Sequence, residues 1–454
     1  MSERTMGGLP KWGYVLCSVG TAIGQVPTNL LLLYYLTQIV GLPASQAGLV
    51  VALPKLWDAL IDPMFGGWVD RLSVRTGRRG PVALIASLGF LAALAFTFSL
   101  PQVHSSLEIL VTVTLLQIIS STAQTALGVT QYALATELTS NQADLSKVLS
   151  RAAVSGQVLS VVFSILAPLL VVWSGGGALG YSLMAIEVAA IAGLALLSFI
   201  FFTRRVPVRP RSAEAEEMPI FTAIRATTAN HAFYCIIAFV MCVNAGAAIL
   251  FGFMPYANQY VLGGAHGSLS VLEGVLGGTV LLGMLVSPLF VSRFETMTSI
   301  RLCNAVVAVM LGLLFLASFG PIWLTWAALA GVGLASGVIG VLVQTATLAA
   351  TRLKLGTAVI VSLGFYLGIM LAGMKIGGSL GGFVSGQLLH LVGFVSGGAE
   401  QSASTLQWLR AGYTLVPMVV TVIAGAFLQR VKLPSTRQPA AEQPAGTPLE
   451  QPAA

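Results

Sequence analysis

Asp58 and Asp62 stand four residues apart inside an apolar stretch of the chain. This spacing places both side chains on one face of a helix. Two carboxylates that close repel each other unless a cation or a proton lies between them. Pro63 frees a carbonyl on the preceding turn, which adds a further oxygen ligand. The pattern predicts a site for a coupling ion, either H+ or Na+. The structural alternatives are that Asp62 caps a broken helix or that Lys55 neutralises Asp58.

Two lysines are placed to act on these carboxylates. Lys55 precedes Asp58 by three residues and can therefore reach the same carboxylate. We expect Lys375 to be the only strongly charged group deep in the second half of the chain. The glycines around it allow close packing of helices. Lys375 should therefore pair with these carboxylates across a cavity, although it could instead extend to the membrane interface. Glu187 is solitary, and a structural and a functional role remain equally open for it.

Neutral polar side chains repeat at steps of three and four residues along one apolar run. These steps put them on one helical face, formed by Gln117, Ser121, Gln124, Gly128 and Gln131, with Thr125 and Tyr132 beside it. Such a face either lines an aqueous cavity or holds helices together by hydrogen bonds. Two other runs contribute Thr21, Gln25, Thr28, Asn29 and Asn244. Groups of this kind suit a neutral polyhydroxy solute.

Composition decides which elements carry these residues. Of 454 residues, 56% are hydrophobic and 9% are charged, against roughly 25% charged in a soluble domain. A membrane span needs about 20 apolar residues, and backbone groups inside lipid must be satisfied by a helix. The sequence predicts an all-α integral membrane protein with twelve spans, at about 12–38, 47–70, 81–100, 108–136, 152–174, 179–203, 229–262, 270–292, 299–317, 320–349, 356–391 and 407–429.

Lysine and arginine predict the orientation of these spans. The loops after the even-numbered spans carry most of them, whereas the opposite loops, at 41–46, 101–107, 175–178, 263–269, 318–319 and 392–406, carry none. Both termini should therefore be cytoplasmic, and we expect a multi-pass protein of the bacterial inner membrane. The net charge of +7 follows from this asymmetry and does not indicate a nucleic-acid partner.

The chain divides into two similar halves. A polar, proline-containing stretch at 204–228 separates a six-span half, 1–203, from a second one, 229–432, and the tail at 433–454 should be disordered. A short sequence match between the halves supports an internal repeat, because Asp62-Pro63-Met64-Phe65 is matched by Ser287-Pro288-Leu289-Phe290. Transporters are commonly built from two repeats with the substrate site at the midplane between them. The pattern predicts the two-half major facilitator fold.

The loop after the second span contains a charged motif. Its residues are Gly67, Trp68, Asp70 and Arg71, followed by Gly77, Arg78, Arg79, Gly80 and Pro81. This motif resembles the major facilitator signature between the second and third spans. Its charges can engage helix ends and acidic partners, and so hold one conformation closed. We expect Asp70, Arg71, Gly77, Arg78 and Arg79 to form this gate, and Glu137 to pair with an arginine of the loop.

The chain also resembles the glycoside–pentoside–hexuronide cation symporter family, the melibiose permease-like branch of the major facilitator superfamily. The resemblance is carried by Val40-Gly41-Leu42, Trp57-Asp58 with Asp62-Pro63, Glu137-Leu138-Thr139 and Lys375-Ile376-Gly377-Gly378. It implies that Asp58, Asp62 and Thr125 bind Na+, Li+ or H+, and that Lys55, Arg151 and Lys375 match basic residues of the family. Two differences matter. Ile61 replaces an amide ligand, which favours H+, and Gly128 replaces a sugar-binding carboxylate.

Together these patterns predict a symporter that works by alternating access. The coupling ion should bind at Asp58, Asp62, Thr125 and Lys55. The solute should bind in a cavity lined by Thr21, Gln25, Asn29, Gln124, Gly128, Tyr132, Arg151, Asn244 and Lys375. We expect a sugar or glycoside as solute, no cofactor, no metal beyond a Na+ ion and a monomeric protein. The alternative cargo is a lysolipid. An enzyme is not expected, because no Ser/His/Asp or metal-spaced cluster occurs.

Overall fold

The apolar runs of the sequence form helices in the computed structural model. The structure describes residues 8–76, 79–100, 105–138, 142–206, 230–264, 268–351, 363–398 and 400–431. Within these ranges the side chains of 62–76, 136, 142–143, 291, 351, 363–365 and 367 are not described. The predicted tail at 433–454 and nearly all of the predicted linker at 204–228 lie outside the described residues.

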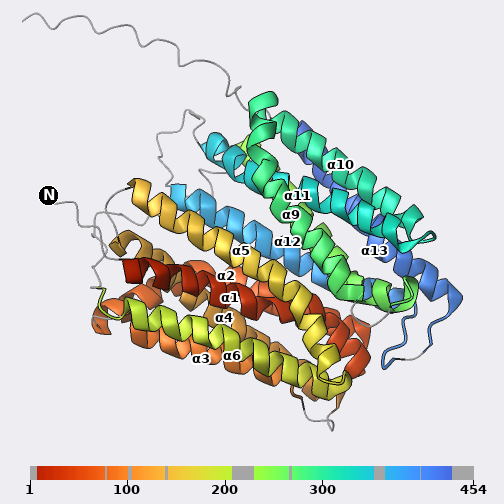
Figure 1. The fold of residues 1–454 in the computed structure, drawn as a ribbon, viewed down its shortest axis with the longest axis horizontal. Coiled ribbons are helices and arrows are strands. Elements are labelled where there is room, and N and C mark those ends of the chain that lie inside the picture. The colour runs from red at the N-terminus through yellow and green to blue at the C-terminus, as the bar shows by residue number, and fades with distance from the viewer. Residues whose placement is uncertain are drawn as a thin grey trace, which may run out of the picture.

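Twelve α-helices are found in the described residues, as predicted. The first half contains α1 (Gly8–Tyr34), α2 (Ala44–Thr76), α3 (Gly80–Thr97), α4 (Ser106–Leu138), α5 (Gln142–Trp173) and α6 (Gly177–Thr203). The second half contains α8 (His231–Tyr256), α9 (Ser268–Arg293), α10 (Thr296–Ala317), α11 (Ile322–Thr351), α12 (Leu363–Leu391) and α13 (Ala403–Gln429). Figure 1 shows the two groups as adjacent bundles, red to yellow-green and green to blue.

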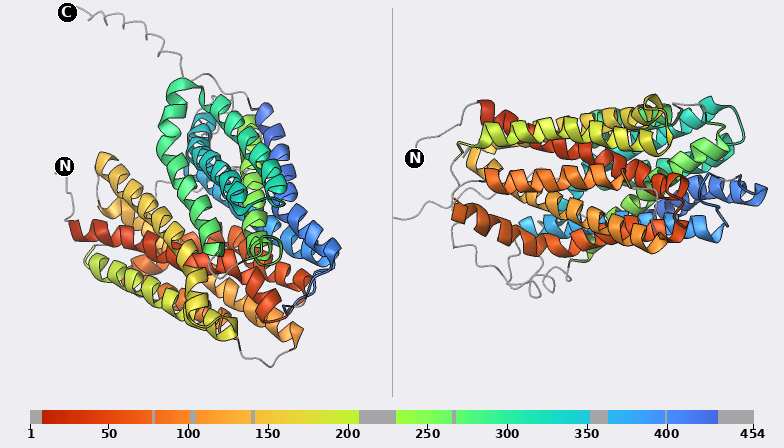
Figure 2. Two further views of the ribbon diagram at one scale, coloured as in Figure 1. Left: turned by 45° about the vertical axis from the view of Figure 1, so that its right-hand side comes forward. Right: turned by 90° about the horizontal axis from the view of Figure 1, so that it is seen from below.

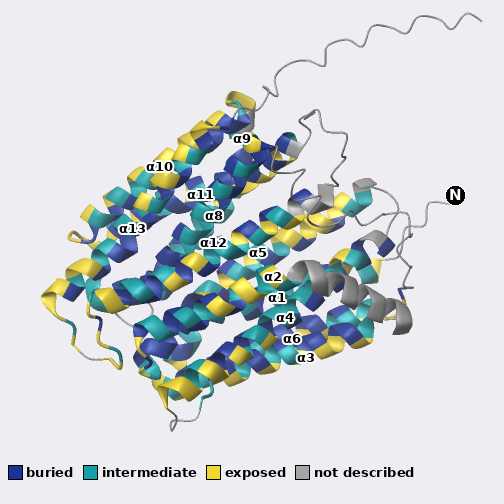
Figure 3. Cartoon of the chain, turned by 180° about the vertical axis from the view of Figure 1, so that it is seen from behind, coloured by how far each residue is buried: buried dark blue, intermediate teal, exposed yellow. Residues whose placement is uncertain are grey.

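Ten of these helices are long and apolar enough to cross a membrane by length and composition, within the part of the chain described. The two others, α2 and α12, carry the charged residues assigned to the ion site. Exposed residues lie along the outward faces of the helices (Figure 3). The exposed side chains include large apolar ones such as Leu194 and Leu285. A bundle that exposes so much apolar surface is suited to a lipid environment.

Helix α5 begins ten residues earlier than the apolar pattern predicts, at Gln142 instead of 152. The reason is that hydropathy marks only the lipid-spanning part of a helix. Asp144 lies in the first turn of α5, where a negative charge favours the helix dipole. Its carboxylate also accepts a hydrogen bond from Lys11 at 3.3 Å. The polar first turns are therefore stabilised outside the apolar run.

Helices α2 and α12 join the two halves along a seam of small residues. They run antiparallel, with Gly48 against Gly386 and Val51 against Gly382. A Cβ atom on Gly48 would lie 2.8 Å from the Cα of Gly386, so the two backbones are in direct contact. Ser379 fixes the register, because its hydroxyl donates to the carbonyl of Ala52 at 2.8 Å. Small residues that allow backbone contact are typical of helix pairs in membranes.

The first helix of each half ends in the same way. Helix α1 continues into a π-helical segment, η1 (Tyr35–Ile39), and α8 continues into η2 (Ala257–Val261). Gly41 and Gly263, two residues beyond these segments, have φ of 81° and 67°, which favours glycine. π-Helical turns are rare and occur frequently at functional sites. The matched ends are a further sign of the internal repeat, and the sequence did not show them.

The two segments meet each other across the boundary between the halves. The ring of Tyr34 packs edge-on against Tyr256 at 5.2 Å between centroids. Tyr260 donates to Gln38 at 2.6 Å, and the two residues are separated by 222 positions. Tyr34 and Tyr256 have the same separation, so each residue meets its own counterpart. Thr37 and Tyr256 add a hydroxyl contact of 2.6 Å.

Among the described residues, the halves are held together at one end, which we call the closed end. It carries the segments 40–43, 262–264, 392–398 and 400–402. Gly397 there donates its amide N–H to the carbonyl of Thr37 at 2.9 Å. At the opposite end, the hydrogen bonds and ion pairs of the described residues join helices of the same half, as in Arg301 to Leu428. Figure 2 shows the two bundles diverging toward that end.

Candidate functional site

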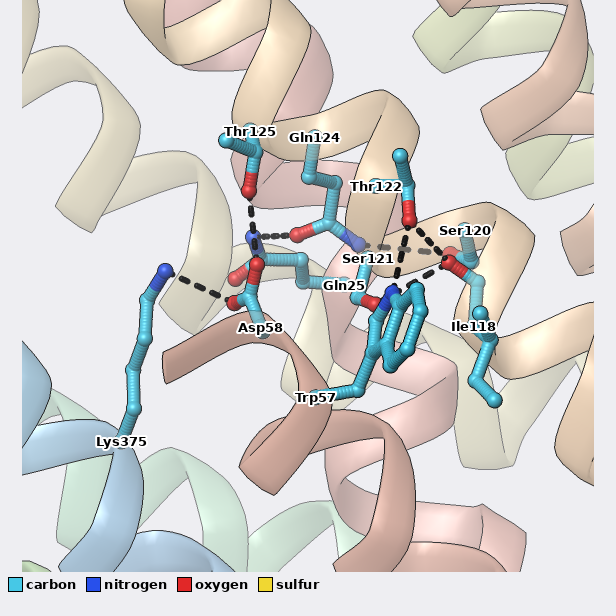
Figure 4. Close-up of polar contacts among 10 residues, drawn as sticks. All are labelled: Gln25, Trp57, Asp58, Ile118, Ser120, Ser121, Thr122, Gln124, Thr125 and Lys375. Atoms are coloured by element: carbon cyan, nitrogen blue, oxygen red, sulfur yellow. Dashed lines mark hydrogen bonds and ion pairs between the residues drawn. The ribbon is translucent and has the colours of Figure 1, made fainter. Parts of the chain in front are cut away.

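Asp58 lies where helices of both halves meet. Its Oδ1 accepts a hydrogen bond from Thr125 Oγ1 on α4 at 2.6 Å. Its Oδ2 lies 2.7 Å from Nζ of Lys375 on α12 (Figure 4). The ion pair is partly buried, because the side chain of Asp58 is 16% exposed and that of Lys375 is 30% exposed. The predicted pairing of Lys375 with a span-two carboxylate is confirmed.

The backbone packing explains why these groups meet. The small residues of the α2–α12 seam bring the two helices together from Gly48 to Asp58. Lys375 then lies one turn beyond the seam on α12 and faces the carboxylate directly. Opposite charges at hydrogen-bond distance and away from bulk water attract more strongly than at a protein surface. Asp62 follows one turn later on α2, but its side chain lies outside the described residues.

Lys55 does not pair with Asp58, which corrects the sequence-based expectation. Among the described residues, none forms a hydrogen bond or ion pair with its ammonium group. A Cβ atom on Gly378 would lie 3.9 Å from Nζ of Lys55, so the side chain runs along α12 instead. The spacing of three residues permits contact with Asp58, but the packing of α12 against α2 directs Lys55 elsewhere.

A network of amides and hydroxyls connects α1 and α4 beside the carboxylate (Figure 4). Gln25 donates to Gln124, and Gln124 donates in turn to Ser120 at 3.3 Å. The predicted polar face of α4 therefore holds helices together in this conformation. It also borders free space, because a Cβ atom on Gly128 would meet nothing within 4 Å. Tyr132, one turn further, is 65% exposed.

Trp57 is a site residue that sequence reasoning did not assign. Its indole Nε1 donates to Thr122 at 3.2 Å, and the side chain is 41% exposed. An indole beside a carboxylate and two glutamines offers a flat apolar face next to hydrogen-bonding groups. Its position directly before Asp58 was the signal that could have identified it.

Other predicted cavity residues either bond within their own helix or have no side-chain partner in the described part of the chain. Thr21 donates to the carbonyl of Cys17 at 2.9 Å, and Asn244 donates to that of Val240 at 2.8 Å, each within its own helix. Asn29 and Arg151 are exposed. The described contacts bring none of these four to Asp58. Gln131 of the polar face instead bonds α1, through the carbonyl of Tyr14 at 3.0 Å.

Of the five residues expected to form the gate, only Arg79 has a described side chain. Arg79 forms two hydrogen bonds with Glu137, from Nε at 3.0 Å and from an Nη atom at 2.9 Å. The expectation that Glu137 pairs with a loop arginine is confirmed, and the pair fastens the start of α3 to the end of α4. Gly77 and Arg78 lie outside the described residues, as do the side chains of Asp70 and Arg71.

Glu273 overturns the expectation that Lys375 is the only charged residue deep in the second half. It lies on α9, it is 2% exposed, and its Oε1 has no hydrogen-bond partner among the described residues. Sequence reasoning missed it because it stands near the predicted start of its span, where a carboxyl could reach water. Glu187, by contrast, is exposed on α6. The described residues include no group of three or more His, Cys, Asp or Glu side chains that could hold a metal.

The comparisons with known proteins agree on one family. A family model described as "MFS/sugar transport protein" matches residues 13–435. The "Uncharacterized symporter YnaJ" of Bacillus subtilis is 26% identical over 432 residues, which cover 89% of either chain. The "Putative glycoside/cation symporter YagG" of Escherichia coli is 25% identical and is matched over 94% of this chain and 92% of its own.

Solved structures share the fold. A bacterial homologue of the human lysosomal transporter Spinster, in an inward-facing and unoccupied conformation, aligns with a TM-score of 0.69 and 16% identity over 92% of this chain and 95% of its own. A D-xylose–proton symporter aligns with a TM-score of 0.68 and 13% identity over 94% of this chain and 97% of its own. At such identities the likeness concerns the fold alone.

Proposed function

Because the chain belongs to the MFS/sugar transport protein family, we propose that it is a cation-coupled symporter that carries a small hydroxylated solute across the membrane by alternating access. The observation that carries this function is the Asp58–Lys375 pair, 2.7 Å between Nζ and Oδ2. It joins α2 of one half to α12 of the other. A change in the charge of Asp58 therefore acts directly on the contact between the two halves.

The coupling ion that the geometry favours is a proton. Asp58 already accepts from Thr125 on one oxygen and faces Lys375 on the other. A sodium ion would need several oxygen ligands, and Ile61 supplies none. A proton on Asp58 needs no further ligand. It removes the negative charge that holds Lys375, so that α2 and α12 lose their charged link.

Proton binding can drive transport only if the two conformations bind the proton differently. In the conformation described here the ammonium of Lys375 stabilises the unprotonated carboxylate. Movement of α12 away from α2 would remove that cation and so favour a protonated Asp58. The same movement would open the closed end, since the α2–α12 seam forms part of it. With the predicted orientation the closed end faces outward, and the structure represents an inward-facing state.

The solute is proposed to bind between the amide network and Lys375. Gln25, Gln124 and Trp57 lie beside Asp58, and the space at Gly128 leaves room for a ligand. Binding would replace the Gln25–Gln124 contact by hydrogen bonds to solute hydroxyls. The more distant predicted residues, Thr21, Asn29, Arg151 and Asn244, would enter the site only with a change in helix positions.

The same family supports a location in a membrane. A multi-pass membrane protein agrees with the apolar helices and with the symporter relatives. The inner membrane, cytoplasmic termini and a monomeric state remain proposals. A lysolipid cargo is not favoured, because the family description names sugar transport and the relatives are named symporters.

The test is proton movement in proteoliposomes that contain a pH-sensitive dye. The panel of solutes includes xylose, melibiose and glucuronate, added outside at constant pH. At least one solute should acidify the lumen in the unmodified protein, and Asp58→Asn should abolish the signal because the proton-binding group is lost. Asp144→Asn is the control, since Asp144 lies at the start of α5 and pairs with Lys11. Persistent solute-driven acidification in Asp58→Asn would show that Asp58 is not the coupling group.

A further inference from the structure

Glu273 on α9 is the most deeply buried carboxyl group that the structure describes. The residue is 2% exposed, and its Oε1 accepts no hydrogen bond from any described residue. No described residue forms an ion pair with it either. A carboxylate buried in this way is strongly disfavoured unless a cation or several donors surround it. The side chain is therefore expected to carry a proton in this conformation.

The groups nearest to Glu273 do not offset a negative charge. Ser270, one turn earlier on α9, and Tyr413 on α13 each have a buried, neutral hydroxyl without a partner among the described residues. Tyr413 is close enough to interact electrostatically with Glu273. Arg410 lies one turn before Tyr413, but its guanidinium is held over the ring of Phe319, 4.3 Å from the centroid. Helix α11, which packs along α9, has no ionisable side chain.

The other helices beside α9 carry their charges toward the opposite end of the bundle. Helix α5 contacts α9 at Gly274 and Gly277, whereas its charged residues lie in its first three turns. On α10, Arg301 donates to the carbonyl of Leu428 at that opposite end. His266 precedes α9 and lies outside the described residues, so a variant of it belongs in the test.

Glu273 lies directly beneath the closed end. Ser268, the first residue of α9, donates to Asn258 of η2 at 2.6 Å. Glu273 follows five residues later, about 7.5 Å along the helix. Segment η2 is in turn bonded to the first half, from Tyr260 to Gln38. Opening of the closed end would break that bond and let water reach η2 and the first turns of α9.

We propose that Glu273 is a second proton-binding site, which must be occupied before the closed end can close. While this end is open, the carboxyl meets water and can lose its proton. Closing the end on an ionised carboxylate would bury an uncompensated charge, so only the protonated form closes. Because the closed conformation binds this proton more tightly than the open one, a rise in pH favours the open conformation. The inference rests on the proposed alternating access, and not on Asp58 as the coupling group.

The two carboxyl groups respond to pH in opposite directions. A proton on Asp58 removes the charged link to Lys375 and favours opening of the closed end. A proton on Glu273 favours closing of the same end. In the described conformation Glu273 is sealed from the opposite end as well, so its proton stays bound while solute is released. Glu273 therefore controls closure and adds nothing to the number of protons carried with each solute.

Hydrogen–deuterium exchange of the segment 392–398 in the purified, full-length protein measures this opening. The exchange is compared at mildly acidic and mildly alkaline pH, after correction for the intrinsic effect of pH on exchange. In the unmodified protein the corrected exchange should become faster in alkali, by up to about tenfold for each pH unit, the most that release of one proton permits. Glu273→Gln cannot lose a proton and should stay protected at both pH values, whereas Glu273→Asp should keep the alkaline response.

Glu187→Gln is the matched control, since Glu187 is exposed on α6, and it should keep the alkaline response. Asp58→Asn should keep it too, so failure of the switch and failure of proton coupling at Asp58 give different results. No alkaline response in the unmodified protein, or an equal one in Glu273→Gln, would overturn the proposal. Loss of the response in His266→Gln would also overturn it, because Glu273 would then be ionised and paired with that histidine. Loss of solute-driven proton uptake in Glu273→Gln would show instead that Glu273 carries the coupled proton.

Discussion

Asp58 is held from two sides by residues of different halves, and this arrangement gives each partner a separate role. Thr125 belongs to the same half as Asp58 and orients Oδ1 at 2.6 Å. Lys375 belongs to the other half and supplies a positive charge to Oδ2 at 2.7 Å. Loss of the hydroxyl should therefore affect how the carboxylate binds a proton, whereas loss of the lysine should affect how the halves hold together.

Thr125→Val tests the role of the hydroxyl. The substitution keeps the shape of the side chain but removes the donor to Asp58. The unprotonated carboxylate is then less stable, so the pH at which solute-driven proton uptake is half-maximal should rise, while the protein remains folded. Thr125→Ser should restore the original pH profile.

Thr130→Val is the control for that experiment, because Thr130 is buried on the same helix and bonds only the carbonyl of Ala126 in the described structure, at 2.8 Å. An unchanged pH profile in Thr125→Val would mean that the hydroxyl positions the helix and does not tune the carboxylate.

At the scale of elements, α12 is the helix that contacts both halves. One of its faces, with Gly378, Gly382 and Gly386, contacts α2 of the first half. The neighbouring face, with Gly377 and Gly381, contacts α8 of its own half. Glycine at these positions lets both neighbours approach the α12 backbone. This packing lets α12 shift against α2 without large side chains having to move.

Gly386→Ala should weaken the closed end. Its Cβ atom would lie 2.7 Å from the carbonyl oxygen of Ala44, which is closer than van der Waals contact allows. Overpacking of this kind costs about 1–3 kcal/mol, so the thermal unfolding temperature in detergent should fall by several degrees. Gly368→Ala on the same helix is the control, because a Cβ atom there meets nothing within 4 Å. Equal unfolding temperatures for the two variants would contradict the described seam.

At the scale of the whole molecule, the closed end is assembled from counterparts in the two halves. Tyr34 meets Tyr256, and Gln38 meets Tyr260. Contacts between equivalent segments are expected when two similar bundles close about a common axis. The Tyr256 hydroxyl is central, since it contacts Thr37 at 2.6 Å and donates to the carbonyl of Leu33 at 3.1 Å. Opening this end for solute must break both contacts.

Tyr256→Phe should shift the protein toward a state that is open at this end. Hydrogen–deuterium exchange of the segment 392–398 should become faster, because the amide N–H of Gly397 donates a hydrogen bond to the carbonyl of Thr37. Tyr413→Phe is the control, since its buried hydroxyl has no hydrogen-bond partner among the described residues. If both variants change exchange equally, the Tyr256 hydroxyl does not hold the closed end.

The sequence by itself determined the twelve helices, the two halves and the ion-site candidates Asp58, Thr125 and Lys375. These depend on properties that are local along the chain: runs of apolar residues, helical spacing and charges that lipid disfavours. Glu273 shows the limit of such reasoning. A position near the end of a span can be wet or fully buried, and hydropathy does not distinguish the two.

Only the tertiary structure decided which charges meet. Lys55 is three residues from Asp58 yet does not pair with it, while Lys375, far along the chain, does. The matched π-helical ends and the contact of each with its counterpart were equally invisible, since they depend on how two bundles are placed against each other. Pairing across the halves is a property of the packed seam between α2 and α12. It arises from backbone approach at glycines, which no local pattern of side chains specifies.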